Sequence, residues 1–223
     1  MFSFGDDFVR TDLGFVPSSN KSFMVHANVG SVNLMREQQI TPAARVNKIP
    51  DGLTIFTNER IEPREIFVYP SKEKFDAFLK NHSLTGQVDS EALSFPIAEK
   101  YNRFSKSLIA LGLGTGKDRA FGLEVELVAL TNPYLPKGRE TMSFELYAFG
   151  KILAGRQVEV YEKRLGGGSV TRRDLVTDEN GRIKFDVSPG NEYMLNSVIY
   201  RAVEGEVQFE SLWASSTFAI LAE

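Results

Sequence analysis

Three segments in the second half of the chain alternate between hydrophobic and polar side chains. In residues 121–129 the hydrophobic residues fall at every second position, and Glu124 and Glu126 fall between them. The same period of two runs through residues 141–149 and 182–187. Because successive side chains of a strand point to opposite faces, this pattern predicts strands with one face on a core and one in water.

Four further segments extend the pattern across this half. We expect strands at residues 157–162, 170–176, 192–201 and 207–221, the last of them broken near Ala214. Turn signals lie between the strands, at Asn132-Pro133, Gly166-Gly167-Gly168, Asn180-Gly181 and Ser188-Pro189-Gly190. Seven short strands joined by turns are typical of a β-sandwich. We therefore predict a seven-stranded β-sandwich domain over residues 118–223, with a hairpin turn at 178–181.

The first half is less regular, because six of the nine prolines break it into short pieces. Candidate strands cover residues 8–13, 23–29, 53–57 and 65–69. A short helix is expected near 71–80, where Ser71 can cap the first turn. One face of this helix is hydrophobic and carries Phe75, Phe78 and Leu79.

A second short helix is expected over residues 97–106, because helical spacing is shared by Tyr101, Phe104 and Leu108. The glycines at positions 112, 114 and 116 predict a flexible joint, so we place a domain boundary between residues 106 and 121. Residues 1–110 would then form an irregular β-rich N-terminal domain. The predicted fold class is mainly β, with two immunoglobulin-like or prealbumin-like β-sandwich domains and one or two short helices.

Composition excludes several classes of function. A net charge of −3 and a pI near 5.6 argue against nucleic acid as a partner. The absence of cysteine excludes disulfides, thiolate metal sites and cysteine nucleophiles. No apolar run approaches the roughly 18 residues of a membrane-spanning helix. The start of the chain lacks the basic and apolar parts of a signal peptide, so we expect a cytosolic protein or an exported one whose signal peptide has been removed.

Of the two histidines, His26 is the better candidate for a metal ligand. Alternation places it on the same face as Met24. A metal site would need further ligands, such as Met24, His82, Asp6 or Asp7, brought together by the fold or by a second subunit. The alternative is a hydrogen-bonded or surface histidine. His82 follows a predicted helix, where the helix dipole favours a cation.

Two carboxylates, Glu124 and Glu126, are the other candidate for chemistry. Acidic side chains two residues apart on a strand lie roughly 6–7 Å apart, which suits acid–base work on a sugar or a hard cation such as calcium. The alternative is a solvated strand face. The glycine-rich run before Lys117 lacks the spacing of both the phosphate-binding and the dinucleotide-binding loops, which favours a linker.

Two further features are candidate contact surfaces. A small basic tip beside the triple-glycine hairpin would meet an anionic partner or remain a solvated loop; its residues are Lys163, Arg164, Arg172 and Arg173. Trp213, with Phe209 and Phe218 nearby, is expected in the sandwich core. The alternative for Trp213 is an exposed aromatic side chain for a glycan or a partner.

Five segments in a fixed order carry a family resemblance, namely residues 101–108, 122–134, 150–160, 177–182 and 210–218. Together they resemble bacterial periplasmic proteins of a domain-of-unknown-function family formerly described as nickel/cobalt-uptake (NikM-like) components. The similarity covers roughly residues 65–223. Residues 150–193 alone are similar to Cna-B-like, carboxypeptidase-regulatory-like and transthyretin-like β-sandwiches. The resemblance implies an exported protein with immunoglobulin-like sandwich domains.

The resemblance does not extend to the Ala-His strand with which family members commonly begin, because the chain has only the reversed pair His26-Ala27. The main expectation is a non-enzymatic periplasmic or secreted binding or accessory protein for an unknown protein or small ligand, with no cofactor and a possible homo-oligomer. One alternative is a divalent-metal (nickel or cobalt) binding component of an uptake system, with His26 as a ligand. A second is a glycan-active enzyme with paired carboxylates. An apolar surface patch without a polar pocket would favour the main expectation.

Overall fold

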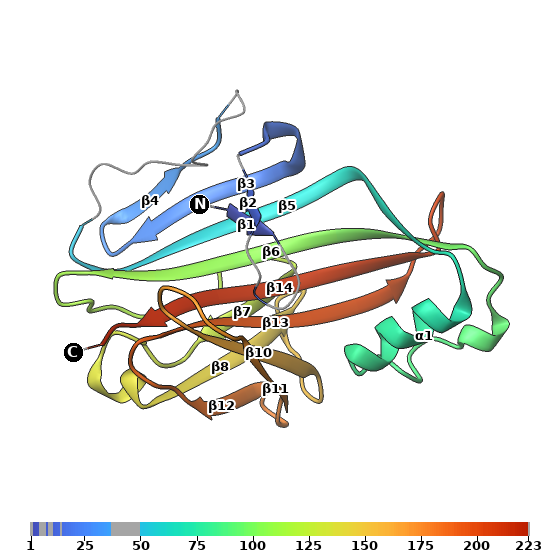
Figure 1. Ribbon diagram of the computed structural model, residues 1–223. Coiled ribbons are helices and arrows are strands. Elements are labelled where there is room, and N and C mark those ends of the chain that lie inside the picture. Colours follow the sequence, from blue (N-terminus) through green and yellow to red (C-terminus); the bar gives the residue numbers. More distant parts are fainter. Residues whose placement is uncertain (1, 5–7, 9–10, 14, 37–49, 223) are drawn as a thin grey trace.

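The computed structural model describes residues 2–4, 8, 11–13, 15–36 and 50–222. Most of these residues lie in strands (Figure 1). In chain order the strands are β1 Phe2–Phe4, β2 Thr11–Leu13, β3 Asn20–Ala27, β4 Gly30–Asn33, β5 Gly52–Tyr69, β6 Ile97–Leu111, β7 Val125–Ala129, β8 Thr141–Ala148, β9 Lys151–Ile152, β10 Gln157–Arg164, β11 Thr171–Val176, β12 Arg182–Asp186, β13 Asn191–Ala202 and β14 Phe209–Ile220. Helix α1 spans Lys72–Asn81, and single 3-10 turns cover Pro17–Ser19, Ser90–Ala92 and Pro136–Arg139.

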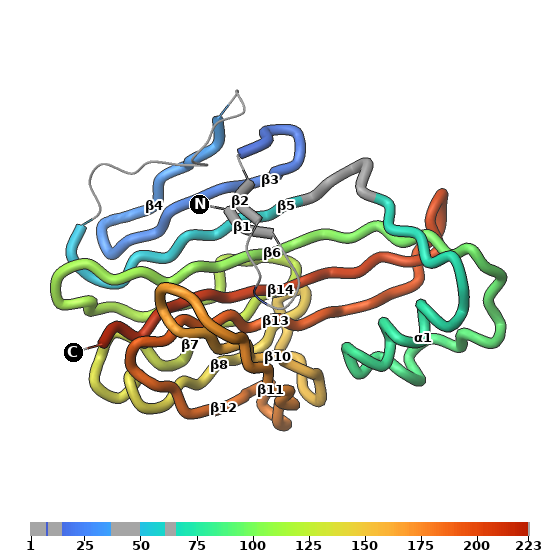
Figure 2. The backbone as a smooth tube through the Cα atoms, in the orientation of Figure 1, coloured from blue at the N-terminus to red at the C-terminus, as the bar shows by residue number. Residues whose placement is uncertain are grey.

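Two sheets form the body of the protein. The larger has eight strands in the order β11-β10-β13-β14-β6-β5-β3-β4, and the smaller has the order β12-β8-β7 with β9 added beside β8. Neighbouring strands are antiparallel except β14 and β6, which are parallel. Figure 2 shows the long strands β5, β6, β14 and β13 running side by side along the whole molecule. The fold is therefore mainly β and sandwich-like.

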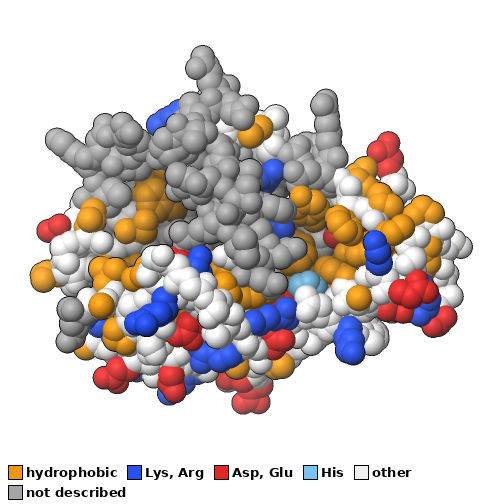
Figure 3. All heavy atoms as spheres, in the orientation of Figure 1, with side chains coloured by type: hydrophobic (Ala, Val, Ile, Leu, Met, Phe, Trp, Pro, Cys, Tyr) orange, Lys and Arg blue, Asp and Glu red, His pale blue; other side chains and the backbone are white. Residues whose placement is uncertain are grey.

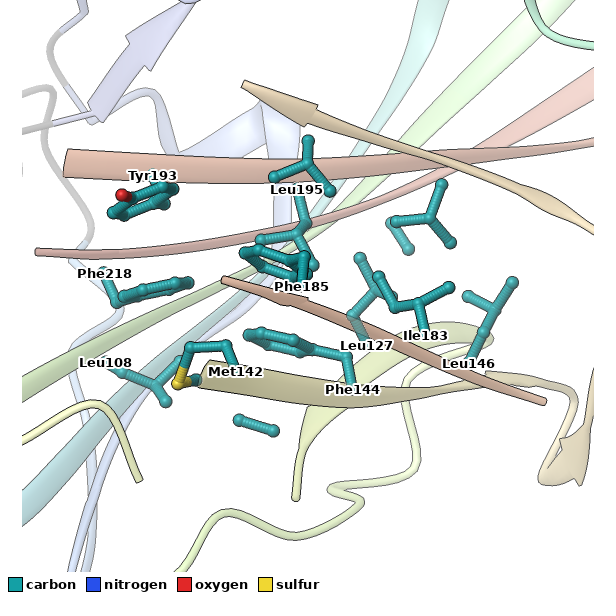
Figure 4. Close-up of a cluster of buried hydrophobic side chains, with 14 of the residues drawn as sticks. Leu108, Leu127, Met142, Phe144, Leu146, Ile183, Phe185, Tyr193, Leu195 and Phe218 are labelled. Atoms are coloured by element: carbon teal, nitrogen blue, oxygen red, sulfur yellow. The ribbon is translucent and has the colours of Figure 1, made fainter. Parts of the chain in front are cut away.

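The main hydrophobic core lies between the two sheets (Figure 4). Aromatic rings stack through its centre: Tyr193 on Phe218 at 5.1 Å, and Phe144 on Phe185 at 6.2 Å between ring centroids. These side chains come from alternating positions of β8, β12, β13 and β14, as a half-buried strand requires. Burial of each such side chain contributes about 1.5–3 kcal/mol to folding.

Helix α1 covers the opposite face of the eight-stranded sheet at one end of the long strands (Figure 1). Phe75 and Leu79 are its buried residues, and they pack on Tyr69, Tyr200 and Phe209 of three different strands. We call this group the helix cluster. It gives the large sheet a second apolar layer on the side away from the main core.

Several sequence-based predictions are confirmed. All seven predicted strands of the second half are present, with ends that differ by a few residues. The helix predicted at 71–80 is α1, although the side chain of Ser71 forms no capping hydrogen bond. Among the described residues, no helix is long and apolar enough to cross a membrane.

Other predictions are wrong in detail. Residues 97–106 belong to strand β6, because Phe104 and Leu108 face the main core at even positions while Tyr101 lies on the other face. Strand β14 continues through Ala214 without a break. The turn at 178–181 is present, but it joins strands of different sheets and so is not a hairpin.

The predicted division into two domains is not confirmed. Strands from both sides of residues 106–121 belong to one continuous sheet. The glycine run is also held in place, because Leu53 N–H donates to the Thr115 carbonyl at 2.7 Å and the Asn132 amide donates to the carbonyls of Gly114 and Gly116. At Gly114, which has a positive φ, a side chain would meet Tyr134 and Ala110 at about 3 Å.

Candidate functional site

His26 lies on β3 and faces Phe121 of the segment between β6 and β7. Its Nδ1 is 2.7 Å from Ser31 Oγ, its Nε2 is 3.0 Å from Thr57 Oγ1, and its ring stacks on Phe121 at 4.0 Å. Burial lowers the pKa of His26, and the positive charge of Arg119 lowers it further. Both ring nitrogens therefore have partners, and the neighbouring positive charge disfavours a bound cation.

Of the further ligands predicted for His26, the structure places His82 at a different site. His82 is engaged elsewhere, with Nδ1 at 2.5 Å from Glu159 Oε1. Asp6 and Asp7 lie outside the described residues. Within the described ranges, no group of three or more His, Asp or Glu side chains is arranged to hold a metal ion.

We expect no binding of nickel or cobalt that depends on His26. The measurement is a thermal-shift titration of chelator-stripped protein and of His26→Gln with each metal. A metal at 100 times its Kd stabilises the folded state by about 2.7 kcal/mol, which would be visible as a shift of several degrees. A saturable shift in the wild type that disappears in His26→Gln would contradict this expectation.

The pair Glu124 and Glu126 does not form a solvated face, because Glu126 is buried. Its carboxylate lies 3.1 Å from Lys106 Nζ and accepts the N–H of Phe121. Lys106 Nζ also lies 2.8 Å from Asp118 Oδ1. We call Lys106, Asp118 and Glu126 the buried ion cluster. Residues 118–122 run along β7 and cover the side that the alternation predicts to be exposed, so the prediction for Glu126 is wrong.

The predicted basic tip is also largely paired. Arg172 bonds to Asp174 at 2.7 Å and lies 3.3 Å from Glu159, and Arg173 contacts Glu162 at 3.5 Å. Lys163 lies over the ring of Phe8 and at 4.0 Å from Glu192, while Arg164 is exposed. Phe218 lies in the main core as predicted, whereas Phe209 and Trp213 pack in the helix cluster on the opposite face of the sheet.

A buried carboxylate that the sequence analysis did not identify lies at the end of α1. Glu159 accepts hydrogen bonds from His82 at 2.5 Å, Tyr161 at 2.9 Å and Asn196 at 3.0 Å, and Arg172 lies beside it. Burial alone would raise the pKa of Glu159, but the hydrogen bond and charge of His82, together with the Asn196 hydrogen bond and the charge of Arg172, lower the pKa overall. This network fastens the end of α1 to strands β10 and β13.

A second buried carboxylate, Glu99 on β6, lies within the helix cluster. Its Oε1 is 3.0 Å from the Ser211 hydroxyl, and its Oε2 accepts the Tyr69 hydroxyl at 3.3 Å. Burial raises the pKa of Glu99 to about 7 against the opposing effect of these hydroxyls. The Tyr200 hydroxyl also faces this carboxyl and lowers its pKa, but no hydrogen bond to it has favourable geometry.

Trp213 connects the two carboxylate networks. Its Nε1 donates to Ser211 Oγ at 2.9 Å, and its ring meets the His82 ring edge-on at 5.0 Å. One acid with a raised pKa and one with a lowered pKa are typical of acid–base sites. Here, however, Glu99 is 3% exposed and Glu159 is 2% exposed, so neither is presented to a substrate.

The most exposed hydrophobic run inside a strand is on β5. Ile66, Phe67 and Val68 are 46%, 51% and 49% exposed. Strand β3 pairs with β5 only between Ile55 and Arg60, so the later part of β5 has no described neighbour on its outer side. Figure 3 shows hydrophobic side chains gathered on the surface toward the end of the molecule where α1 lies. We call Ile66–Tyr69 the free edge of β5.

A protein-family model matches most of the chain. The model described as "Domain of unknown function (DUF4198)" matches residues 2–200. No curated protein and no solved structure matches the chain. The predicted resemblance to a domain-of-unknown-function family is confirmed, whereas the nickel/cobalt-uptake link and the Cna-B-like similarity are not.

Proposed function

The chain belongs to the DUF4198 family, whose function is unknown, and we propose that it is a periplasmic binding or accessory protein without catalytic activity. In this proposal, the free edge of β5 holds an extended segment of a partner protein. The observation that carries it is the exposure of three successive hydrophobic residues, Ile66, Phe67 and Val68, on a strand edge that pairs with no other described residue.

Strand addition fits this edge on two counts. An edge strand leaves alternate N–H and C=O groups unpaired, and another polypeptide strand satisfies them best. The side chains are apolar on both faces of the sheet: Phe67 lies on the side of α1, where it contacts the ring of Tyr69 at 4.8 Å, and Ile66 and Val68 lie on the other side. Such a surface favours a partner segment with hydrophobic residues on both of its faces.

The partners of the buried ionisable groups support a role in binding over catalysis. Glu126, which the glycan-active alternative requires, is neutralised by Lys106, and His26, which the metal alternative requires, has both ring nitrogens engaged. Glu99 and Glu159 are enclosed beneath α1. The periplasmic location rests on the family resemblance of residues 65–223.

Photo-cross-linking tests this proposal. A benzoylphenylalanine at position 67 replaces one aromatic residue by another, so we expect the fold to persist. In cells, this variant should form a discrete cross-linked product that is recovered in the periplasmic fraction. The mass of the product distinguishes a second copy of the chain from a different protein.

The matched control places the same cross-linker at Val176, which is 66% exposed at the end of edge strand β11. That strand carries Arg172, Arg173 and Asp174, and charged side chains on an edge discourage strand addition. We therefore expect no discrete product from position 176. Absence of a product at position 67, or the same product from both positions, would contradict the proposed function.

A further inference from the structure

We propose that protonation of the buried Glu99 controls whether the free edge of β5 is available to a partner strand. The inference rests on the proposed function, because it assigns a regulator to the same edge. Glu99 lies directly opposite Phe67 in the register of β5 and β6. Tyr69, on the same face of β5, contacts the Phe67 ring and donates its hydroxyl to Glu99 Oε2. The edge and the acid are thus parts of one packed unit.

Each element packed around Glu99 contributes a polar or charged group. Strand β14 contributes the Ser211 hydroxyl, β13 contributes the Tyr200 hydroxyl, and the end of α1 contributes His82. On β6 itself, Arg103 lies further along the same face as Glu99. Its guanidinium is 5.2 Å from the centroid of the Trp213 ring. No ion pair within the described residues includes Glu99, since His82 is paired with another carboxylate.

The surroundings fit a neutral Glu99 better than an ionised one. The hydroxyls of Ser211, Tyr200 and Tyr69 favour the ionised form, but they do not offset the burial of the carboxyl. An ionised carboxylate can only accept, and burying its charge without a cation is costly. Burial accordingly raises the pKa of Glu99 to about 7. Ionisation therefore favours any local opening that admits water.

The free edge of β5 is the element that opens most easily. Strand β14 is paired on both sides, and β13 beyond Asn196 is paired with β14 over six successive residues without a register shift. Helix α1 is fastened by the His82–Glu159 contact and by Arg172 bonded to Asn81. In the part of the chain that the structure describes, the free edge is paired on one side only, over four residues, after a register shift between Ile61 and Ile66. Local opening occurs first where few contacts hold a segment.

The expected consequence is weaker partner binding at higher pH. With a pKa of about 7, about nine-tenths of Glu99 is protonated at pH 6 and about one-tenth at pH 8. When only one form is competent to bind, the apparent affinity scales with the fraction of that form. A partner strand should therefore bind about tenfold more weakly at pH 8 than at pH 6.

Two measurements test the effect of Glu99 protonation on the free edge of β5 when no partner is present. Trp213 is the single tryptophan of the chain, and it is linked to Glu99 through Ser211, so its fluorescence should titrate with a midpoint near pH 7. As the pH rises through 7, the hydrogen-exchange protection of the amides of residues 66–69, corrected for the intrinsic exchange rate, should fall. Both changes should be absent in Glu99→Gln.

Two further variants test which side chain is responsible for the titration. His82 also contacts Trp213, so His82→Asn should keep the titration if Glu99 is the group responsible. Tyr69→Phe removes a hydrogen bond that lowers the pKa of Glu99, so the midpoint should move to higher pH, which serves as the test if Glu99→Gln does not fold. A titration that survives Glu99→Gln, one that disappears in His82→Asn, or an edge whose protection is independent of pH would overturn the inference. Each of these results leaves the cross-linking test of the proposed function unaffected.

Discussion

Lys106→Met is expected to destabilise the protein by about 3–5 kcal/mol, because it leaves two buried carboxylates without their cation. Lys106 lies on β6 in the large sheet, Glu126 lies on β7 in the small sheet, and Asp118 lies in the segment between them. The side chains of all three are at most 1% exposed. The buried ion cluster therefore ties the two sheets together, and removing one member leaves the others unable to reach water.

Thermal or urea unfolding measures this effect. For a chain of this size, about 3–5 kcal/mol corresponds to a fall in Tm of roughly 6–20 °C. Lys184→Met is the matched control, because Lys184 is exposed on β12 and its loss should change stability by no more than about 0.5 kcal/mol. Asp118→Asn with Glu126→Gln in the Lys106→Met background should recover much of the loss. Equal effects of Lys106→Met and Lys184→Met would contradict the role of the cluster.

Glu99→Gln is expected to remove a stability loss that the wild type suffers as the pH rises. The pKa of Glu99 in the folded protein is about 7, against 4.5 for the ordinary side chain. The folded state therefore holds the proton more tightly, and this contribution to stability is complete below pH 4.5 and is lost as the pH rises through 7. A shift of this size amounts to about 3 kcal/mol.

The measurement is the free energy of unfolding of both proteins between pH 4 and pH 8. The difference between them should change by about 3 kcal/mol in favour of Glu99→Gln as the pH rises. The lowered pKa of Glu159 acts in the opposite direction, with stability lost as the pH falls, but it is common to both proteins and cancels in the difference. Parallel pH profiles would show that Glu99 is not the group responsible.

Sequence periodicity predicted the strands whose two faces meet different surroundings. Strand β12 shows this best, because Ile183 and Phe185 enter the core while Arg182 and Lys184 face water. Strand β6 was misassigned because it is central and covered on both faces. Each face mixes hydrophobic with polar residues: Phe104 lies on the same face as the buried Lys106, and Ile97 lies on the same face as the buried Glu99. Hydrophobic and polar positions therefore do not alternate with a period of two along this strand.

The candidate site could not be predicted from the sequence, because it forms where strands far apart in the sequence pair with each other. Glu99 and Ser211 are 112 residues apart and meet only through the parallel pairing of β6 with β14. The hydrophobic run of Ile66, Phe67 and Val68 was predicted as an ordinary strand. Its exposure follows from where β3 stops pairing, opposite Arg60, and no local signal in the sequence marks that point.

Glu126 illustrates a different limit. Alternation correctly separates it from the hydrophobic residues of β7, but it gives no information about what covers the polar face. Here a buried lysine and the backbone of residues 118–122 cover it. A charged residue at an alternating position therefore indicates which face it occupies and leaves its exposure undetermined.

The most direct test of the account is hydrogen exchange of the wild-type protein with and without the partner segment identified by cross-linking at position 67. Strand addition forms new main-chain hydrogen bonds, so amides of residues 66–69 should gain protection while those of edge strand β11, residues 171–176, remain unchanged. Unchanged exchange at residues 66–69, with protection appearing elsewhere, would show that the free edge of β5 is not the binding surface.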